Sequence, residues 1–432
     1  MRNFMRKFTL LIASLFLTVG AMAQTFVEPQ VGKFYKIKGN HSTNPWLTAV
    51  VENGGIDVSS DEANAGIFMR IENGLQEVST GKYIGTKNNQ ITLVTTADET
   101  LIEAADGGRF YIKTGGRYLY NNQPDYTREA GNLTAAGPDD TKWGFIEVDY
   151  DDPFNNKVFA LDSYMDYIYC LTDGNTNIYT NGSFTGVADT RALWMPEIVK
   201  VGVYKIKNVH TGLYIGATQH NSSVQMSETP GNYEIATAAG SETAQDGKYY
   251  IKVAGVNACM HSTAATAKGW EGGGLGNQYV FTELSEFSHT LAVGTTEWST
   301  LVLGFNATIP TNEGFKAYTV ETIEGTTVKL AEAIGVLAAN TPIIVNAPQG
   351  NYTFAYTTEE ATVAANGKLC GTLYNKNISE EAYVLGIPDG ETEAVLGKAG
   401  MSNGSWLNNA NKAYLPVSAV PAALQGAASF SF

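Results

Sequence analysis

Short segments in which apolar and polar residues alternate recur along the first two-thirds of the chain. Val31-Gly-Lys-Phe-Tyr-Lys-Ile-Lys38 returns as Val201-Gly-Val-Tyr-Lys-Ile-Lys207, and weaker forms begin at Gly108 and Gly247. A period of two residues is typical of a β-strand with one buried face. Each segment precedes a turn and a second short strand, as in Thr80-Gly-Lys-Tyr-Ile-Gly85, where glycine suits a hairpin turn. The pattern therefore predicts repeated β-hairpins.

The second strand of each hairpin gives a clearer register, because an aromatic residue or cysteine followed by Leu, Ile or Met recurs there. The pairs are Trp46-Leu47, Tyr83-Ile84, Tyr118-Leu119, Cys170-Leu171, Tyr214-Ile215 and Cys259-Met260. All units except the second close with an aromatic-centred strand, and we expect no such strand over 97–105. A unit of about 40 residues with four short strands fits a β-propeller blade or a β-trefoil lobe.

Two features favour trefoils over one propeller. The strongest opening segment occurs only at Val31 and Val201, and an acidic insert with a proline, Asp149-Tyr-Asp-Asp-Pro-Phe-Asn-Asn156, separates the third and fourth units as a linker would. Against this, Val201 opens the fifth unit, so a domain beginning there would show only two lobes. We expect two trefoils, at 24–150 and 151–288, with the propeller as the alternative.

The repeat stops near residue 288, and apolar strands of uneven spacing follow. Pro342-Ile-Ile-Val345 and Tyr352-Thr-Phe-Ala-Tyr356 are examples, and Gly, Asn and Pro punctuate them. Such strands predict a β-sandwich over 289–432. This segment resembles a C-terminal module of secreted bacterial multidomain proteins, a resemblance that implies no activity. The expected fold class is all-β, with two tandem β-trefoil domains plus a C-terminal β-sandwich.

The repeat itself, with Tyr-Lys-Ile-Lys-Asn, Thr-Gly-x-Tyr-Ile and a closing aromatic strand, resembles the ricin-type β-trefoil lectin family over about 31–285. That resemblance implies shallow glycan pockets, up to one per lobe. The family's Gln-x-Trp signature is absent. The position where many members carry a sugar-binding Asp holds Thr48, Gly85, Tyr120, Thr172, Gly216 and His261. Glycine has no side chain to accept a sugar hydroxyl, so the resemblance supports the fold more strongly than galactose binding.

Charge and targeting signals narrow the function classes. The net charge is −15 and no basic cluster stands out, which excludes nucleic-acid binding and adhesion to anionic lipid. Arg2, Arg6 and Lys7, an apolar stretch and Ala21-Met-Ala23 predict a secretory signal over 1–23, so we expect export to the periplasm, the cell surface or the medium. No later apolar segment is long enough to cross a membrane, and we expect no membrane insertion.

Candidate catalytic and metal-binding patterns are weak. The five histidines have neither His-Glu-x-x-His nor i, i+4 spacing. Gly400-Met-Ser-Asn-Gly404 matches a nucleophile pattern, but no helical period follows it. Cys170, Cys259 and Cys370 are too few for a disulfide framework and predict buried thiols. We expect no catalytic residue, no metal and no cofactor.

The strongest candidate for ligand contact is Trp270, because the glycines around it cannot bury it. Flat aromatic rings stack on the apolar faces of sugars, although such a tryptophan could also be a packing residue. Tyr120, Asn121 and His261 are further candidate carbohydrate contacts. We expect a non-enzymatic lectin-like protein that binds glycans or glycoproteins. The alternatives are a protein-binding adhesin or protease-inhibitor-like trefoil, and a hydrolase with an unrecognised site.

Overall fold

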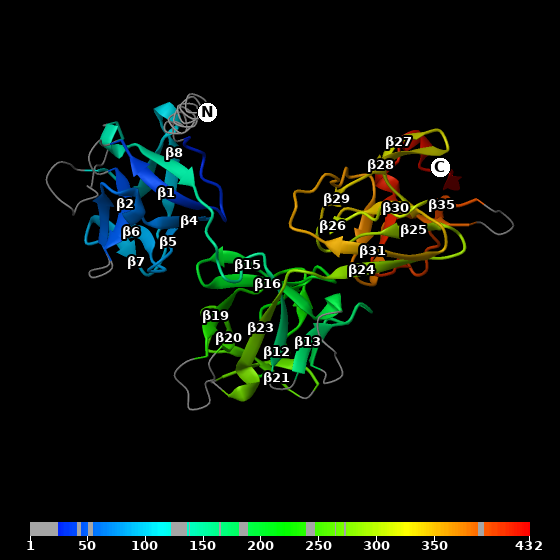
Figure 1. Ribbon diagram of the computed structural model, residues 1–432, viewed down its shortest axis with the longest axis horizontal. Helices are drawn as coiled ribbons and strands as arrows, with labels where there is room; N and C mark the ends of the chain where they lie inside the picture. The colour runs from blue at the N-terminus through cyan, green and yellow to red at the C-terminus, as the bar shows by residue number, and fades with distance from the viewer. Residues whose placement is uncertain are drawn as a thin grey trace, which may run out of the picture. The chain divides into compact units, whose positions relative to one another are not determined.

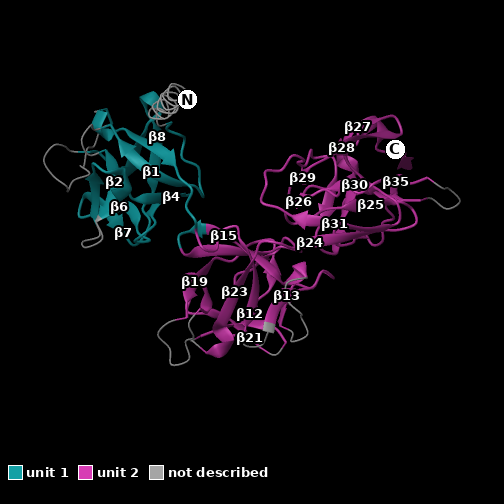
Figure 2. Cartoon of the chain, viewed as in Figure 1, with its two compact units in different colours: residues 1–151, 199–201 teal, residues 152–198, 202–432 magenta. Residues whose placement is uncertain are grey.

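The computed structural model describes residues 25–40, 45–50, 55–121, 136–137, 139–163, 166–180, 189–238, 247–263, 265–271, 274–387 and 393–432. The predicted signal sequence lies outside these residues. The chain divides into two compact units, Met1–Asp151 with Val199–Val201, and Asp152–Ile198 with Gly202–Phe432 (Figure 2). Within the described ranges the protein is all-β. The helical segments in these ranges are short 3-10 turns: η1 (Glu62–Asn64), η2 (Asp106–Gly108), η3 (Asp139–Thr141), η5 (Thr190–Ala192), η6 (Leu275–Asn277), η7 (Val417–Ala419) and η8 (Ala422–Leu424).

Unit 1, whose strands are blue to cyan in Figure 1, is a β-trefoil whose strands belong to one sheet. Its strands are β1 (Phe34–Gly39), β2 (Trp46–Val50), β3 (Gly55–Ser59), β4 (Ile67–Ile71), β5 (Gly74–Glu77), β6 (Tyr83–Lys87), β7 (Gln90–Val94), β8 (Thr100–Ala104), β9 (Phe110–Thr114), β10 (Arg117–Tyr118) and β11 (Trp143–Glu147). β1 pairs with β4 and β11, β4 with β5, β8 with β9, and β9 with β11. The Thr100 amide, which donates to the Asn73 carbonyl, links β5 to β8. The β2–β3 and β6–β7 hairpins extend from this barrel.

The alternating residues of unit 1 build one core. Tyr35, Ile37, Trp143 and Phe145 are fully buried, and the Trp143 indole donates to the Leu119 carbonyl at 2.9 Å. The second lobe corrects one prediction, because a closing strand does exist where we expected none. β8 has the sequence Thr-Leu-Ile-Glu-Ala and lacks the aromatic residue that marks this strand in the other lobes.

Unit 2 begins with a second trefoil in which all three lobes are present. Its strands are β12 (Val158–Ser163), β13 (Asp166–Cys170), β14 (Ile178–Thr180), β15 (Leu193–Lys200), β16 (Val203–Asn208), β17 (Tyr214–Ile215), β18 (Met226–Ser227), β19 (Tyr233–Thr237), β20 (Tyr249–Val253), β21 (Cys259–Ser262), β22 (Ala267–Trp270) and β23 (Gln278–Leu284). β12, β15, β16, β19, β20 and β23 pair in that order, and β23 returns to β12. The closed ring excludes a propeller. The β13–β14, β17–β18 and β21–β22 hairpins complete the lobes.

The first lobe of this trefoil lacks a recognisable opening segment because β12 is covered on both faces. Phe159 and Leu161 point into the barrel core, whereas Val158 and Ala160 pack in a second cluster with residues of the C-terminal region. A strand buried on both sides has no polar alternation. The segment at Val201 therefore opens the second lobe of the domain.

The acidic insert that the sequence suggested as a linker contributes to the second trefoil's core. Asp152 is buried and accepts hydrogen bonds from the Tyr204 hydroxyl at 3.1 and 3.0 Å and from the Phe154 amide at 2.9 Å. The Phe154 ring packs edge-on against Tyr204, Tyr249 and Phe281, with centroids 5.1–5.7 Å apart. The linker prediction is wrong for these two residues, since both are buried and Phe154 belongs to the core of the second trefoil.

The C-terminal region is a β-sandwich with a third sheet packed on one face. Its strands are β24 (Ser288–Val293), β25 (Trp298–Leu301), β26 (Ala307–Thr308), β27 (Lys316–Glu324), β28 (Thr327–Ala333), β29 (Val336–Leu337), β30 (Ile343–Asn346), β31 (Gly350–Tyr356), β32 (Cys370–Thr372), β33 (Lys376–Ile378), β34 (Ala382–Gly386), β35 (Val395–Lys398), β36 (Trp406–Asn408), β37 (Lys412–Pro416) and β38 (Ser429–Phe430). The sheets have the orders β24-β31-β26-β29, β25-β30-β27-β28 and β32-β37-β34-β35-β38, and β33 pairs with β36. In the middle sheet, Ile343 and Val345 pack against Phe354 on one side, whereas Ile344 packs against Leu415 on the other.

Candidate functional site

The β21–β22 hairpin presents an exposed tryptophan. His261 lies opposite Lys268 in the strand register, and Trp270 is two residues beyond Lys268, so the three side chains share one face of the hairpin. Met260 points to the other face and is fully buried in the core. The face that carries Trp270 is therefore the outer one, and 43% of this residue remains exposed.

Two imidazoles flank the Trp270 indole. The His220 ring centroid is 5.2 Å from that of Trp270 and the His261 centroid is 6.0 Å away, with interplanar angles of 38° and 37°. Nδ1 of His261 lies 3.3 Å from Oδ1 of Asn277. Nδ1 of His220 lies 3.9 Å from Oε1 of Glu271. The cluster combines one apolar ring face with several hydrogen-bonding groups, and we call Trp270, His220, His261 and Glu271 the tryptophan site.

Main-chain hydrogen bonds between two lobes position the tryptophan site. The Asn221 amide donates to the Gly269 carbonyl, and the Gly269 amide donates to the Ser222 carbonyl, both at 2.8 Å. A Cβ on Gly269 would lie 2.2 Å from the Gln219 carbonyl oxygen, so only glycine allows this approach. His220 lies on the loop between β17 and β18, in the second lobe, whereas Trp270 lies in the third. The sequence around Trp270 therefore does not predict that His220 lies beside it.

Unit 1 also has a candidate site, a hollow of about 390 Å³ beside the β6–β7 hairpin. Lys82, Thr86 and Asp98 are among the residues that line it. Oδ2 of Asp98 accepts from the Thr86 amide at 2.8 Å and from the Thr86 hydroxyl at 3.0 Å. A Cβ on Gly85 would stand 3.0 Å from this oxygen. Asp98 thus brings a carboxylate next to the position where the family resemblance implies an aspartate.

Tyr120 and Asn121 belong to unit 1, so the structure does not bring them together with Trp270 and His261. Asn121 is 1% exposed, and its backbone amide donates to the Asp140 carbonyl at 2.8 Å. Tyr120 is half-buried. The structure therefore divides the predicted contacts between exposed Trp270 with half-buried His261 in unit 2 and half-buried Tyr120 with buried Asn121 in unit 1.

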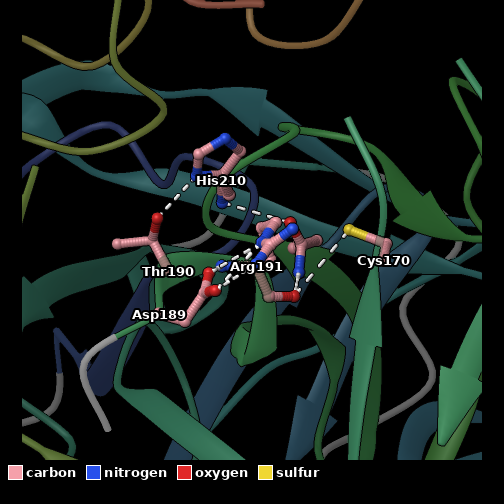
Figure 3. Close-up of polar contacts among 6 residues, drawn as sticks. Cys170, Asp189, Thr190, Arg191 and His210 are labelled. Atoms are coloured by element: carbon pink, nitrogen blue, oxygen red, sulfur yellow. Dashed lines mark hydrogen bonds and ion pairs between the residues drawn. The ribbon is translucent and has the colours of Figure 1, made fainter. Parts of the chain in front are cut away.

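A buried polar cluster in the second trefoil contains the residue types of a nucleophilic site, and Figure 3 shows its geometry. The Cys170 thiol lies 3.8 Å from the Arg191 carbonyl oxygen and 3.6 Å from the Thr211 hydroxyl. Burial raises the pKa of Cys170 to about 12. The neighbouring imidazole, His210, contacts the Thr190 hydroxyl at 2.5 Å. A buried thiol with a raised pKa stays protonated near neutral pH and is a poor nucleophile.

The same cluster holds one ion pair. Asp189 caps the η5 turn by accepting from the Arg191 amide at 2.9 Å, and its carboxylate also binds the Arg191 guanidinium. Burial alone would raise the pKa of Asp189, but the hydrogen bonds from Arg191 outweigh this and lower it. Burial, together with the nearby His289, lowers the pKa of His210 to about 4. His210 is therefore a neutral imidazole near pH 7.

Other candidate chemistry is limited in the described part of the chain. No group of three or more His, Cys, Asp or Glu side chains there is arranged to hold a metal ion. Ser402 lies in a turn closed by reciprocal backbone bonds with Ser405, rather than between a strand and a helix. Within the described ranges, no helix has the length and apolar character to span a bilayer. All three cysteines are free, with Cys170 and Cys259 buried and Cys370 half-buried.

No protein-family model matches the sequence, and no curated protein matches it. Several solved structures are similar over part of the chain. A lectin from Polyporus squamosus bound to a human-type influenza-binding epitope is 14% identical with a TM-score of 0.25, and the match covers 32% of this chain and 51%, about half, of the lectin. The designed threefold-symmetric protein ThreeFoil is 16% identical (TM-score 0.25; 29% of this chain, 99% of ThreeFoil). The Macrolepiota procera ricin B-like lectin in complex with lactose is 12% identical (TM-score 0.26; 30% of this chain, 97% of the lectin).

Proposed function

We propose that this protein binds glycans or glycoproteins through its trefoil lobes and does not act on them as an enzyme. The exposed Trp270 indole between two imidazoles carries the proposal. An exposed indole offers an apolar face to a sugar ring, and the imidazoles of His220 and His261 and the carboxylate of Glu271 offer hydrogen bonds to its hydroxyls. Few polar contacts and one stacked ring give weak affinity per site.

We propose the hollow beside Asp98 as a second glycan-binding site. Its carboxylate can accept sugar hydroxyls, and the Lys82 side chain lines the same hollow. Two weak sites on one chain bind a multivalent surface more tightly than either site alone. Residues 1–23 predict export, so we propose that this binding takes place in the periplasm, at the cell surface or in the medium.

A glycan array followed by titration of the positive glycans tests the proposal. We expect Trp270→Ala to weaken binding at least tenfold, and Trp270→Phe to retain part of it because a flat ring remains. Val256→Ala is the matched control, since Val256 is another exposed apolar side chain of the same lobe (49% exposed). An array without signal from folded protein would overturn the proposal. Retained binding to a cell-surface protein would then favour the adhesin alternative.

A further inference from the structure

One half-buried lysine of the C-terminal region, Lys412, has no carboxylate partner among the described residues. Nζ of Lys412 donates to the Ser299 hydroxyl at 2.9 Å and to the Thr300 carbonyl at 3.5 Å. Among the described residues no Asp or Glu pairs with it, and burial alone lowers its pKa. Lys376 and Lys398, in the same region, instead pair with carboxylates that raise their pKa values. Burying an ammonium group without a counter-charge is unfavourable.

The acceptors around Lys412 do not account for its charge. β25 is an edge strand of the middle sheet. A side chain that donates a hydrogen bond to the Thr300 carbonyl can take the place of a neighbouring strand there. A neutral amide or hydroxyl group would do this without partly desolvating a charge. The positive charge of Lys412 is therefore available to an anionic partner from outside the chain.

Lys412 lines a hollow of about 350 Å³ between β25, β34, β36 and β37. Trp298 and Trp406 contribute to its walls, Asn409 adds an amide group, and Leu407, 54% exposed, lines it as well. The wall therefore combines aromatic side chains with many polar groups, a mixture that suits a polar small ligand such as a sugar. The volume is sufficient for a monosaccharide unit.

The two tryptophans of this hollow are held by their surroundings. The Trp298 ring stacks on Phe432 at 4.7 Å with an interplanar angle of 10°. Trp406 packs edge-on against Tyr414 at 5.1 Å, and its indole N–H donates to the Glu380 carbonyl at 3.0 Å. Rings fixed in this way lose little conformational entropy when a ligand stacks on them.

We propose that this hollow binds a saccharide unit that carries a carboxylate, such as a uronic acid. The carboxylate pairs with the Lys412 ammonium, forming a charge-assisted hydrogen bond in a partly desolvated site. The ring packs against Trp298 and Leu407, which are not buried, and the Asn409 side chain is available to the hydroxyls. The inference does not depend on the tryptophan site, because the hollow belongs to the C-terminal region and uses none of the same residues.

Calorimetric titration of the mature chain with D-glucuronate and with D-glucose tests the proposal. We expect glucuronate to bind at least tenfold more tightly than glucose. Lys412→Met should remove this preference, and Lys412→Arg should keep part of it because the charge remains. Lys398→Met is the matched control, since it removes an exposed lysine charge that does not line the hollow. It should leave glucuronate binding unchanged.

A second variant keeps the test independent of folding defects at Lys412. Leu407→Glu places a negative charge on an exposed position of the hollow and should weaken glucuronate binding without affecting the core. Equal binding of glucuronate and glucose would overturn the inference, as would undiminished binding by both Lys412→Met and Leu407→Glu. Competition by acetate as strong as by glucuronate would overturn the saccharide class and indicate a simple carboxylate site.

Discussion

At the scale of single residues, the surroundings of Gly269 and His210 affect the stability of the second trefoil. Gly269 lies against backbone of the neighbouring lobe, where a Cβ would come 2.2 Å from the Gln219 carbonyl oxygen and 2.9 Å from its carbon. Backbone atoms cannot rotate away as a side chain can. His210 is a titratable group whose buried environment disfavours the charged form of the imidazole. Both features lead to measurable expectations.

Gly269→Ala should destabilise unit 2 by about 1–3 kcal/mol, as overpacking does elsewhere. It should also weaken any binding at the tryptophan site, because the carbonyl contact must open and Trp270 is the next residue. Urea unfolding measures the stability change. Gly294→Ala is the control, since a Cβ there meets nothing within 4 Å. Equal stability of both variants would contradict the close approach.

The stability of unit 2 should fall as the pH drops from 6.5 towards 4. An unfolded chain protonates its histidine near pH 6.5, whereas folded His210 stays neutral to about pH 4. Between these values the unfolded state binds more protons, so the free energy of unfolding decreases, by up to about 3 kcal/mol. His289, whose pKa burial also lowers, adds to the loss.

Thermal unfolding at a series of pH values measures this effect. His210→Gln should flatten the profile between pH 6.5 and 4, because the group that takes up a proton on unfolding is gone. Asp189, whose pKa lies below the usual 3.8, contributes only at more acidic pH. An unchanged slope in the His210→Gln variant would show that another group is responsible.

At the scale of strands and turns, burial decides which parts of the fold the sequence predicts. β1 and β16 have one face toward solvent, so their alternation predicts them, whereas β12 has two buried faces and no such alternation. β8 has no aromatic residue, so the repeat pattern does not predict it. A third sheet cannot be distinguished from a two-layer sandwich by pattern, because β30 reads as one apolar run in either case.

The same reasoning applies to the candidate site. Trp270 and His261 lie on one hairpin, so a repeat register can nominate both. His220 comes from another lobe, and only the tertiary fold places it 5.2 Å from the indole. Lys412 carries no signal in the sequence, because only the tertiary fold shows that a lysine is half-buried without a carboxylate beside it. The sequence therefore does not show which residues from different lobes or sheets lie next to one another.

Phe154→Ala should destabilise the second trefoil by about 3–5 kcal/mol, the usual range for removing a buried aromatic ring. A true linker would tolerate the change. Pro153, the exposed neighbour, serves as control, and Pro153→Ala should change the free energy of unfolding far less. Chemical denaturation of both variants provides the comparison. A neutral Phe154→Ala would restore the linker interpretation.

At the scale of the whole molecule, the second trefoil and the C-terminal region share a hydrophobic cluster. Val158, Ala160 and Leu193 of the trefoil belong to the same buried cluster as Leu301 and Phe354 of the sandwich. Both belong to unit 2, in agreement with this shared cluster. Separating them would expose a contiguous apolar surface, which favours aggregation.

A fragment spanning 152–288 should therefore aggregate or unfold at lower temperature than a fragment spanning 152–432. Size-exclusion chromatography and thermal unfolding of the two fragments test this expectation. Val158→Asn in the longer fragment should also lower its unfolding temperature, because the substitution buries an unpaired amide. A stable, monomeric 152–288 fragment would show that the shared cluster contributes little.

The middle sheet of the C-terminal region also determines which substitutions this protein can accumulate over evolutionary time. Ile343, Ile344 and Val345 are all fully buried, because successive side chains enter two different cores. A saturation mutagenesis scan should show a continuous block of intolerant positions there, whereas β31 should alternate between tolerant and intolerant ones. Sequence drift in β30 is confined to exchanges among aliphatic residues, so this strand should identify distant homologues when surface loops no longer can.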